Sequence, residues 1–346
     1  MIVPIHLENR TAVKYDVVID ALPELTFNRK VAIVTNTTVS ALYLEQLKSK
    51  IFADELFVIT VEDGEEFKTL ATVERILDEL CEYQLDRKSL LIALGGGVIG
   101  DMTGFTASVY LRGIAFVQVP TTLLAQVDAS VGGKTGVNNK YGKNLIGTFY
   151  QPEAVYIDTD FLKTLPPREF ASGIAEIIKM GVMFDIEFFN ALMEADFTQK
   201  DVLDKMVQRS VEIKVEVVNL DEKESGIRAV LNYGHTFGHV IENETNYKTY
   251  VHGEAVAIGM MMANALAVEL GMMTQVQMDL VTKFLKKHNL PISYDVKDVD
   301  AFYAKFFLDK KTAHNKLKFI LPEGIGGHMI RDDISEETLK KVLKAF

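Results

Sequence analysis

Cysteine and long apolar runs are almost absent from this chain of 346 residues. Its one cysteine, Cys81, excludes a disulfide framework and is typical of a reducing compartment. The first residues, MIVPIHLENR, lack a basic segment followed by an apolar run, so we expect no signal peptide. The longest apolar stretch, residues 255–270, is interrupted by Asn264 and Glu269, whereas a membrane span needs about 20 apolar residues. These absences predict a cytoplasmic protein that does not enter a membrane.

Positive charge is also in deficit. The chain has 37 lysines and arginines against 48 acidic residues, a net charge of −11. A surface of this sign disfavours nucleic acid as a partner, although a small anionic substrate is compatible with a local cluster of basic residues. We find no repeat and no low-complexity segment, and the length suggests about two domains.

Short β-branched runs alternate with helical patterns in the first half of the chain. Strands are expected at residues 31–35, 56–60, 89–94, 115–119 and 154–158, and helices at residues 38–50 and 70–83. Strands separated by helices favour right-handed crossovers and a mostly parallel sheet. The fold class predicted for this half is therefore α/β, with a Rossmann-like domain.

The pattern becomes helical after Pro166 and Pro167. Helices are expected at residues 169–184, 201–220, 231–245, 253–270 and 273–288. Because proline restricts the residue before it and commonly opens a helix, the double proline is a natural boundary. We predict an α/β domain at residues 1–165 and a mostly α-helical domain at residues 166–346.

A glycine loop follows the third predicted strand. Gly95, Gly97 and Gly100 match G-x-G-x-x-G, in which glycines and a helix N-terminus can receive a pyrophosphate. A tight strand-to-helix turn without a ligand gives the same pattern, and the motif alone does not separate the two. The acidic residue expected about 20 positions later is missing, since Asp128 lies 28 residues beyond Gly100. A dinucleotide site here would therefore differ from the standard Rossmann arrangement.

Residues 120–144 are rich in small and amide side chains, and they include Lys134 and Lys143. Position 128 is aspartate where a Walker A motif has its first glycine, which argues against a P-loop. Lysines beside glycine amides suit a phosphate or carboxylate. The stretch fits either an anion site or a surface loop, and the absence of acidic residues after Asp128 favours the anion site.

Glu176 lies in an apolar helical pattern, where a carboxylate is costly unless it is paired or binds a metal. Three histidines, His235, His239 and His252, lie within 18 residues. If residues 228–242 were helical, Arg228, Asn232, His235 and His239 would share one face. Imidazole and carboxylate suit a zinc-like ion, and the spacing favours His235 and His239 as its ligand pair. Each histidine alone also fits an ordinary core or surface role.

Several motifs run in order along most of the chain and together resemble the 3-dehydroquinate synthase family, with wider similarity to other sugar-phosphate cyclases and to metal-dependent alcohol and glycerol dehydrogenases. The motifs are residues 63–69 (DGEEFKT), 95–101 (GGGVIGD), 112–113 (RG), 120–128 (PTTLLAQVD), 132–134 (GGK), 142–144 (GKN), 175–179 (AEIIK) and 228–239 (RAVLNYGHTFGH).

The resemblance implies a role for each matching residue. It implies metal ligation by Glu176, His235 and His252, and it moves His239 from the ligand pair to proton transfer. The implied catalytic residues are His239, Lys134, Asn144 and Glu224. The implied substrate contacts are Arg112, Asp128, Lys134, Asn144, Lys179, Lys214, Arg228, Asn232 and Lys310. The implied NAD contacts are Asp63, Gly64, Glu65, Glu66, Phe67, Lys68, Gly95, Gly96, Gly97, Val98, Asp101, Thr121, Thr122, Lys143, Phe161, Leu162, Lys163 and Thr164.

The implied activity uses NAD and one divalent metal, zinc or cobalt, in a homodimer. It converts 3-deoxy-D-arabino-heptulosonate 7-phosphate to 3-dehydroquinate by transient oxidation, phosphate elimination, re-reduction and intramolecular aldol closure, within aromatic amino-acid biosynthesis. Alternatives are another sugar-phosphate cyclase of the valiolone or inosose type, a metal-dependent polyol dehydrogenase, and a nucleotide-binding module without activity.

Overall fold

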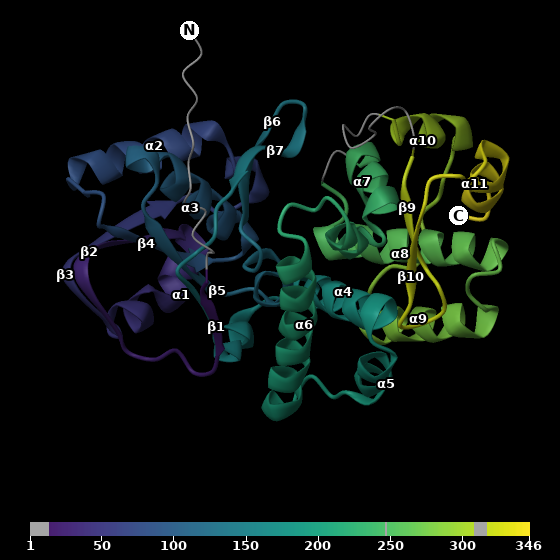
Figure 1. Ribbon diagram of the computed structural model, residues 1–346, viewed down its shortest axis with the longest axis horizontal. Helices are drawn as coiled ribbons and strands as arrows, with labels where there is room; N and C mark the ends of the chain where they lie inside the picture. Colours follow the sequence, from purple (N-terminus) through teal and green to yellow (C-terminus); the bar gives the residue numbers. More distant parts are fainter. Residues whose placement is uncertain (1–13, 246–247, 308–316) are drawn as a thin grey trace, which may run out of the picture. The chain divides into compact units, whose positions relative to one another are not determined.

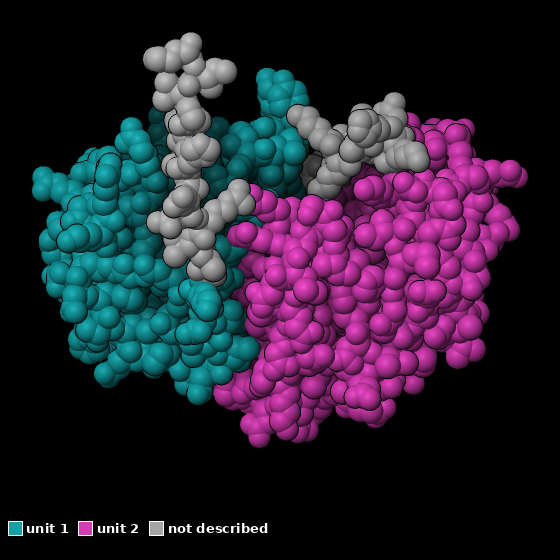
Figure 2. Space-filling model, in the orientation of Figure 1, with its two compact units in different colours: residues 1–120, 133–158 teal, residues 121–132, 159–346 magenta. Residues whose placement is uncertain are grey.

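The structure, a computed structural model, describes residues 14–245, 248–307 and 317–346. It divides into two compact units, which Figures 1 and 2 show. Unit 1 comprises the chain up to Pro120 together with Gly133–Asp158, and unit 2 comprises Thr121–Gly132 and Thr159–Phe346. The domain boundary expected after residue 165 stays a prediction.

Unit 1 is built on a sheet of six strands, all parallel, in the order β1-β8-β5-β4-β2-β3. The strands are β1 (Asp16–Ile19), β2 (Leu25–Asn36), β3 (Ile51–Val61), β4 (Leu90–Gly95), β5 (Ala115–Pro120) and β8 (Ala154–Ile157). Helices α1 (Thr37–Lys48), α2 (Leu70–Glu82) and α3 (Gly97–Val109) connect them, and β6 (Lys134–Asn139) pairs with β7 (Gly142–Phe149) in a separate hairpin. The predicted Rossmann-like parallel sheet is confirmed.

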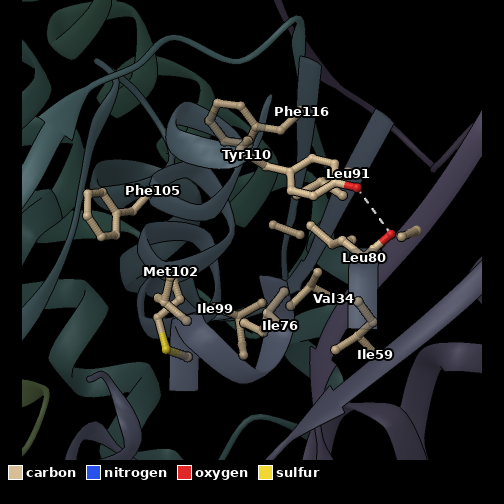
Figure 3. Packing of buried hydrophobic residues seen from close by; sticks show 14 of the residues in the cluster. Val34, Ile59, Ile76, Leu80, Leu91, Ile99, Met102, Phe105, Tyr110 and Phe116 are labelled. Carbon is tan, nitrogen blue, oxygen red and sulfur yellow. Dashed lines mark hydrogen bonds between the residues drawn. The ribbon is translucent and has the colours of Figure 1, made fainter. Parts of the chain in front are cut away.

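At the centre of the sheet both faces are buried, which explains why β4, β5 and the second half of β2 are nearly continuous apolar runs. Ala32 and Val34 face a cluster that includes α2 and α3, and the intervening Val31 and Ile33 are equally inaccessible. Figure 3 shows part of this cluster, with the Tyr110 hydroxyl donating a hydrogen bond to the Leu80 carbonyl at 3.2 Å. The core therefore holds β2 and β4 rigidly at the centre of the sheet.

The connections of the sheet reverse direction between β2 and β4. From β2 the chain goes to β3 on one side, then crosses to β4 on the other side and continues outward to β5 and β8. In open α/β sheets, ligands bind beyond the carboxyl ends of strands at such a switch point. Here those ends are Asn36 and Gly95.

Unit 2 is mostly helical, as predicted. Its helices are α4 (Pro167–Phe184), α5 (Ile186–Glu194), α6 (Lys200–Leu220), α7 (His235–Glu244), α8 (His252–Glu269), α9 (Gln275–Lys287), α10 (Val299–Lys305) and α11 (Glu336–Leu343). Shorter elements are a π-helical turn (Ala125–Ala129), 3₁₀ turns (Thr159–Thr164 and Ile227–Asn232) and the antiparallel pair β9 (Phe319–Pro322) and β10 (His328–Arg331). No described helix is both long and apolar enough to cross a membrane.

The helix expected over residues 231–245 is wrong at its start. A 3₁₀ turn covers Ile227–Asn232, and α7 begins only at His235, after Gly234 with φ +81°. A Cβ atom on Gly234 would lie 2.7 Å from Cγ of Met260 and 2.8 Å from the carbonyl of Val256. Close packing against α8 therefore requires glycine in a left-handed conformation, which interrupts the helix. Arg228 and Asn232 do not share a helical face with the histidines.

Two further glycines bring α7 and α8 into close contact. A Cβ atom on Gly259 would lie 2.0 Å from the carbonyl oxygen of Gly234, and one on Gly238 would lie 3.0 Å from the carbonyl oxygen of Ala255. The first distance is too short for any larger residue without a shift of the backbone, and the second would require Ala255 to move by a few tenths of an ångström. The approach of the two helices, and with it the separation of the histidines at their N-termini, is thus fixed by the glycines.

The stability of unit 2 should fall in acid because of His288. Its Nε2 is buried without a hydrogen-bond partner among the described residues, and its ring packs 4.5 Å from that of Phe284. Burial, with a smaller contribution from Lys287, lowers the pKa of His288 from 6.5 to about 4. Between these values the unfolded chain binds the proton and the folded chain does not, so stability is lost as the pH falls below 6.5.

His288→Gln, which carries no titrating group, should remove this pH dependence. Because the ring is partly exposed, solvent screening reduces the effect, and we expect the loss of unfolding free energy from pH 7.5 to pH 5 to be smaller in the variant by about 1 kcal/mol. Urea unfolding at both pH values measures the difference. Equal losses in the variant and the original chain would show that His288 is not the responsible group.

Candidate active site

The glycine loop of unit 1 lies at the switch point of the sheet. Strand β4 ends at Gly95, and Gly96 precedes α3 without a side chain to cap it. A Cβ atom on Gly95 would lie 2.7 Å from Cβ of Ile99, and one on Gly100 would lie 2.6 Å from Oε1 of Gln118. The first turn of α3 thus keeps backbone N–H groups available for an anion, and the glycines permit its close packing.

Lys68 joins two other predicted residues of unit 1, Asp101 and Asn144. It is 4% exposed, and its Nζ lies 2.6 Å from Oδ2 of Asp101 and 2.5 Å from Oδ1 of Asn144. Burial alone would lower the pKa of Lys68, but the Asp101 and Glu65 carboxylates raise it, so the ammonium stays charged. Asn144 has φ +54°, and its N–H donates to Oδ1 of Asn138 at 2.8 Å. The side chain of Asn144 is therefore held by Lys68 on a constrained backbone.

Asn36 is a residue of this edge that the sequence analysis missed. Its Oδ1 caps α1 by accepting from the N–H of Val39, and its Nδ2 donates to Oδ1 of Asp63 at 2.7 Å. An asparagine between a buried strand and a helix is a recognisable N-cap signal. Asp63, a predicted NAD contact, is thereby tied to the carboxyl end of β2.

The basic stretch at residues 120–144 is divided between the two units. Thr121–Gly132 packs with unit 2, where a Cβ atom on Gly173 would lie 2.6 Å from Cβ of Leu123. Lys134 opens β6 and is exposed, and Lys143 lies in β7. Arg112 is exposed in unit 1, with φ +70°. The stretch is thus a helical turn followed by a hairpin, and it is not a single surface loop.

Unit 2 gathers one carboxylate and two imidazoles. Glu176 lies on α4, and His235 and His252 are the first residues of α7 and α8. Oε1 of Glu176 lies 3.9 Å from Nε2 of His235 and 3.7 Å from Nε2 of His252. The three possible ligand atoms all lie within 4.8 Å of one another. A divalent ion fits such a group, with a position left open for a substrate oxygen.

The surroundings of Glu176 favour a cation. The side chain is fully buried, and its Oε2 pairs with Nζ of Lys179. Its Oε1, the atom that faces both histidines, has no hydrogen-bond partner among the described residues. An unpaired buried carboxylate oxygen is costly, and a metal ion at the centre of the group would satisfy it.

Both histidines are turned so that Nε2 faces Glu176. Nδ1 of His235 lies 3.2 Å from the carbonyl oxygen of Tyr233, and Nδ1 of His252 lies 3.4 Å from Oε1 of Glu242. Such contacts place the proton on Nδ1 and leave Nε2 as a ligand. Burial, followed by the charge of Lys179, holds the pKa of His235 well below its usual value, which keeps this ring neutral.

His239 lies one turn into α7, with its ring centroid 5.5 Å from that of His235. It is not part of the group of mutually close ligand atoms, which contains His252 instead. The pair favoured by spacing alone therefore differs from the group in the structure, whereas the set implied by the resemblance coincides with it. The metal and proton-transfer roles themselves stay predictions.

Two buried lysines meet one aspartate beside this group. Oδ1 of Asp128 lies 2.7 Å from Nζ of Lys214 and 4.0 Å from Nζ of Lys179. Burial opposes ionisation of Asp128, but the two cations hold its pKa well below the usual range. Burial lowers the pKa of Lys214 to about 8, although Asp128 opposes the shift. Burial also acts to lower the pKa of Lys179, but Glu176 and Asp128 raise it overall.

The 3₁₀ turn before α7 positions the remaining predicted substrate residues. Arg228 is 2% exposed and donates from Nη2 to the carbonyl of Gly132 at 3.0 Å. Nδ2 of Asn232 donates to Oε1 of Glu224, which has φ +58°. The structure therefore brings Glu224 to Asn232, a contact that the sequence spacing did not indicate.

Other predicted residues have mainly structural surroundings. Thr121 is buried, and Oγ1 of Thr122 accepts from the N–H of Ala125 at 3.2 Å. Phe161 and Leu162 are buried in the 3₁₀ turn Thr159–Thr164, and Lys163 pairs with Asp160 at 3.0 Å. Lys310 lies outside the described residues.

Comparisons with known proteins support this fold. A solved 2-epi-5-epi-valiolone synthase from Streptomyces hygroscopicus subsp. jinggangensis 5008, with NAD+ and Zn2+ bound, is 28% identical, with 98% of each chain covered and a TM-score of 0.89. A solved 2-deoxy-scyllo-inosose synthase, complexed with carbaglucose-6-phosphate, NAD+ and Co2+, is 26% identical, with 92% of this chain and 91% of that chain covered and a TM-score of 0.79. The chain thus has the fold of the sugar-phosphate cyclases.

Sequence comparison identifies the family within this class. The family model for the N-terminal part of 3-dehydroquinate synthase matches residues 58–172, and the model for the C-terminal part matches residues 173–312. A 3-dehydroquinate synthase from Sulfurovum sp. (strain NBC37-1) is 66% identical over 346 residues, covering 100% of this chain and 99% of its own. The chain belongs to the 3-dehydroquinate synthase family.

Proposed function

We propose that the chain is a lyase that depends on NAD and a divalent metal and converts 3-deoxy-D-arabino-heptulosonate 7-phosphate to 3-dehydroquinate and phosphate. Membership of the family supports the reaction. The observation that carries the metal dependence is the group formed by Glu176, His235 and His252, with Oε1 of Glu176 unsatisfied at its centre. This activity belongs to aromatic amino-acid biosynthesis.

The two solved cyclases bind NAD+ together with Zn2+ or Co2+. We propose that this chain likewise binds NAD and one divalent metal ion. Bound at these sites, the metal supplies Lewis-acid polarisation of a substrate hydroxyl, and NAD supplies a reversible hydride acceptor. Glu176, His235 and His252 would hold the ion. The open end of the switch point, with the α3 N-terminus and Asp63, would hold the dinucleotide.

The charged residues of unit 2 suit a substrate that carries a phosphate and a carboxylate. Three of these side chains are buried, namely Lys179, Lys214 and Arg228. Their charges therefore act in a medium of low polarity. Asp128 balances part of this charge in the free protein. We propose that these cations orient the substrate in one conformer and exclude competing ones, which is the largest contribution of the protein to a cyclisation.

Two amides are preset by their neighbours to meet the substrate. Lys68 donates to Oδ1 of Asn144, so Nδ2 of Asn144 remains a donor for an anionic oxygen. Glu224 accepts a hydrogen bond from Nδ2 of Asn232, which fixes the direction of the Oδ1 acceptor of Asn232. We assign substrate positioning to both amides, proton acceptance to Glu224, and alignment of the departing phosphate to Lys134 and His239.

The function is tested by phosphate release from 3-deoxy-D-arabino-heptulosonate 7-phosphate. We expect release that requires NAD, stops after treatment with a metal chelator and returns on addition of Co2+ or Zn2+. NADH should not accumulate, because the reaction returns the hydride to its product. Release without the metal or without NAD would contradict the proposal.

The same assay separates the alternatives. A sister cyclase would release phosphate from another sugar phosphate and not from the heptulosonate, and a polyol dehydrogenase would accumulate NADH without releasing phosphate. The 66% identity to a 3-dehydroquinate synthase over the whole chain, against 28% and 26% to the two other cyclases, favours the heptulosonate. The cytoplasmic location, the homodimer and the choice between zinc and cobalt stay predictions.

A further inference from the structure

The backbone on both sides of the proposed metal ligands is held by a close contact between α4 and α8. The N–H of Gly253 donates to Oγ of Ser172 at 2.9 Å. A Cβ atom on Gly253 would lie 2.2 Å from the carbonyl oxygen of Ser172. Ser172 lies one turn before Glu176, and Gly253 directly follows His252. This contact fixes the distance between the two ligand backbones.

The backbone contact does not by itself fix the orientation of the His252 imidazole, which is the more exposed of the two rings, with 31% of its side chain accessible against 11% for His235. Rotation would replace Nε2 with Nδ1 or carbon at the metal position. A ligand of this kind needs a second contact that fixes the ring and its proton. For His235, the backbone carbonyl of Tyr233 provides the contact.

We propose that Glu242 is the positioning residue for His252. It lies on α7, is 2% exposed, and its Oε1 is 3.4 Å from Nδ1 of His252. A carboxylate at this place holds the proton on Nδ1, directs Nε2 toward Glu176 and increases the basicity of the imidazole. It also adds negative charge close to a site where Lys179 already offsets part of the charge of Glu176.

Burial of Glu242 is consistent with this role. A carboxylate in the interior is costly unless its charge is compensated, and the imidazole N–H of His252 supplies part of that compensation. A cation on the other nitrogen of the same ring polarises that N–H and stabilises the carboxylate through it. Glu242 and the metal ion therefore stabilise each other across His252.

Glu244, on the same helix, provides a matched control. Its Oε1 pairs with Nζ of Lys305 at 2.9 Å, and its Oε2 accepts from the hydroxyl of Tyr294 at 2.8 Å. Among the described residues it makes no hydrogen bond or ion pair with a histidine, and its two contacts hold α7 against α10 and the segment that precedes α10. Glu244→Gln therefore removes a partly buried charge from α7 without touching the ring of His252.

The inference rests on the proposed metal site, so the experiment measures Co2+ binding directly. Calorimetry and the visible spectrum of bound Co2+ are compared for the full chain, Glu242→Gln, Glu242→Ala and Glu244→Gln. We expect Co2+ affinity to fall about 10-fold in Glu242→Gln, which keeps a hydrogen-bond acceptor, and about 100-fold in Glu242→Ala. The spectrum should change in the alanine variant, and Glu244→Gln should bind Co2+ as the original chain does.

Each outcome decides one claim. If the original chain does not bind Co2+, the metal site of the proposed function is wrong. If it binds, and Glu242→Gln binds with equal affinity, the positioning role is overturned, because a residue needed only for packing would lower the melting temperature without changing the affinity. Should Glu242→Ala fail to fold, the comparison of Glu242→Gln with Glu244→Gln still decides.

Discussion

Glu176→Gln should release the metal and lower the rate of phosphate release at least roughly 1,000-fold, equivalent to about 4 kcal/mol of transition-state stabilisation. The variant keeps the size of the side chain and removes the charge that faces both histidines. Lys179, whose ammonium pairs with Glu176, would lose its closest carboxylate. Metal content after gel filtration and the phosphate assay at saturating substrate measure the two effects.

His239→Gln is the matched comparison, because His239 lies beside the group of ligand atoms and is not one of them. We expect this variant to lose turnover and to retain a full equivalent of metal. The assignment of ligands would be contradicted if Glu176→Gln kept its metal. It would also be contradicted if His239→Gln, in which Glu176 is still present, lost its metal.

Asp128→Asn should lower the unfolding free energy by about 3 kcal/mol at pH 7, because it leaves the charges of Lys179 and Lys214 in a buried place without their shared partner. The two lysine side chains are 1% and 6% exposed, whereas Asp128 is 25% exposed, so relaxation of the aspartate position limits the loss. Urea unfolding of the variant and the original chain at pH 7 measures this difference in unfolding free energy.

The pH dependence of this variant provides its control. The pKa of Lys214 is already lowered to about 8 by burial, and without Asp128 it should fall further. The unfolded chain then holds a proton that the folded chain has lost, so stability should recover as the pH rises from the folded pKa toward 10.5. Asp128→Asn combined with Lys214→Met should show no such recovery. If Asp128→Asn alone were as stable as the original chain, the ion pairs of Asp128 with Lys179 and Lys214 would contribute little to the unfolding free energy.

The parallel sheet could be predicted because its signals are local. Residues 89–94 are apolar, β-branched or leucine-rich and end in glycines, and the structure has β4 and the α3 N-terminus at this place. The same holds for residues 31–35 and 115–119, which lie within β2 and β5. A continuous apolar run indicates a strand that is buried on both faces, so the sequence alone is sufficient to predict such strands.

The start of α7 could not be predicted because its cause is not local. The residues before His235 continue a helical pattern, but Gly234 packs against Met260 of α8, 26 positions later in the sequence. That packing also decides which histidines meet. His235 and His239 are close on any helix, whereas the approach of His252 depends on Gly234, Gly238 and Gly259 in the contact between α7 and α8.

Glu242 shows the same limit within the site. In the sequence it is one acidic residue near the end of an amphipathic helix, where a charged side chain is ordinarily exposed. Its burial and its contact with His252 arise from the pairing of α7 and α8. Motif similarity pointed to Glu176, His235 and His252, but the residues that orient these ligands become visible only when the packing is known.

The position of the metal is the central claim, and anomalous diffraction from crystals grown with Co2+ tests it most directly. We predict one strong peak at a bonding distance of about 2.0–2.2 Å from a carboxylate oxygen of Glu176 and from Nε2 of both His235 and His252. A peak coordinated by His235 and His239, or the absence of any peak at Glu176, would contradict the account.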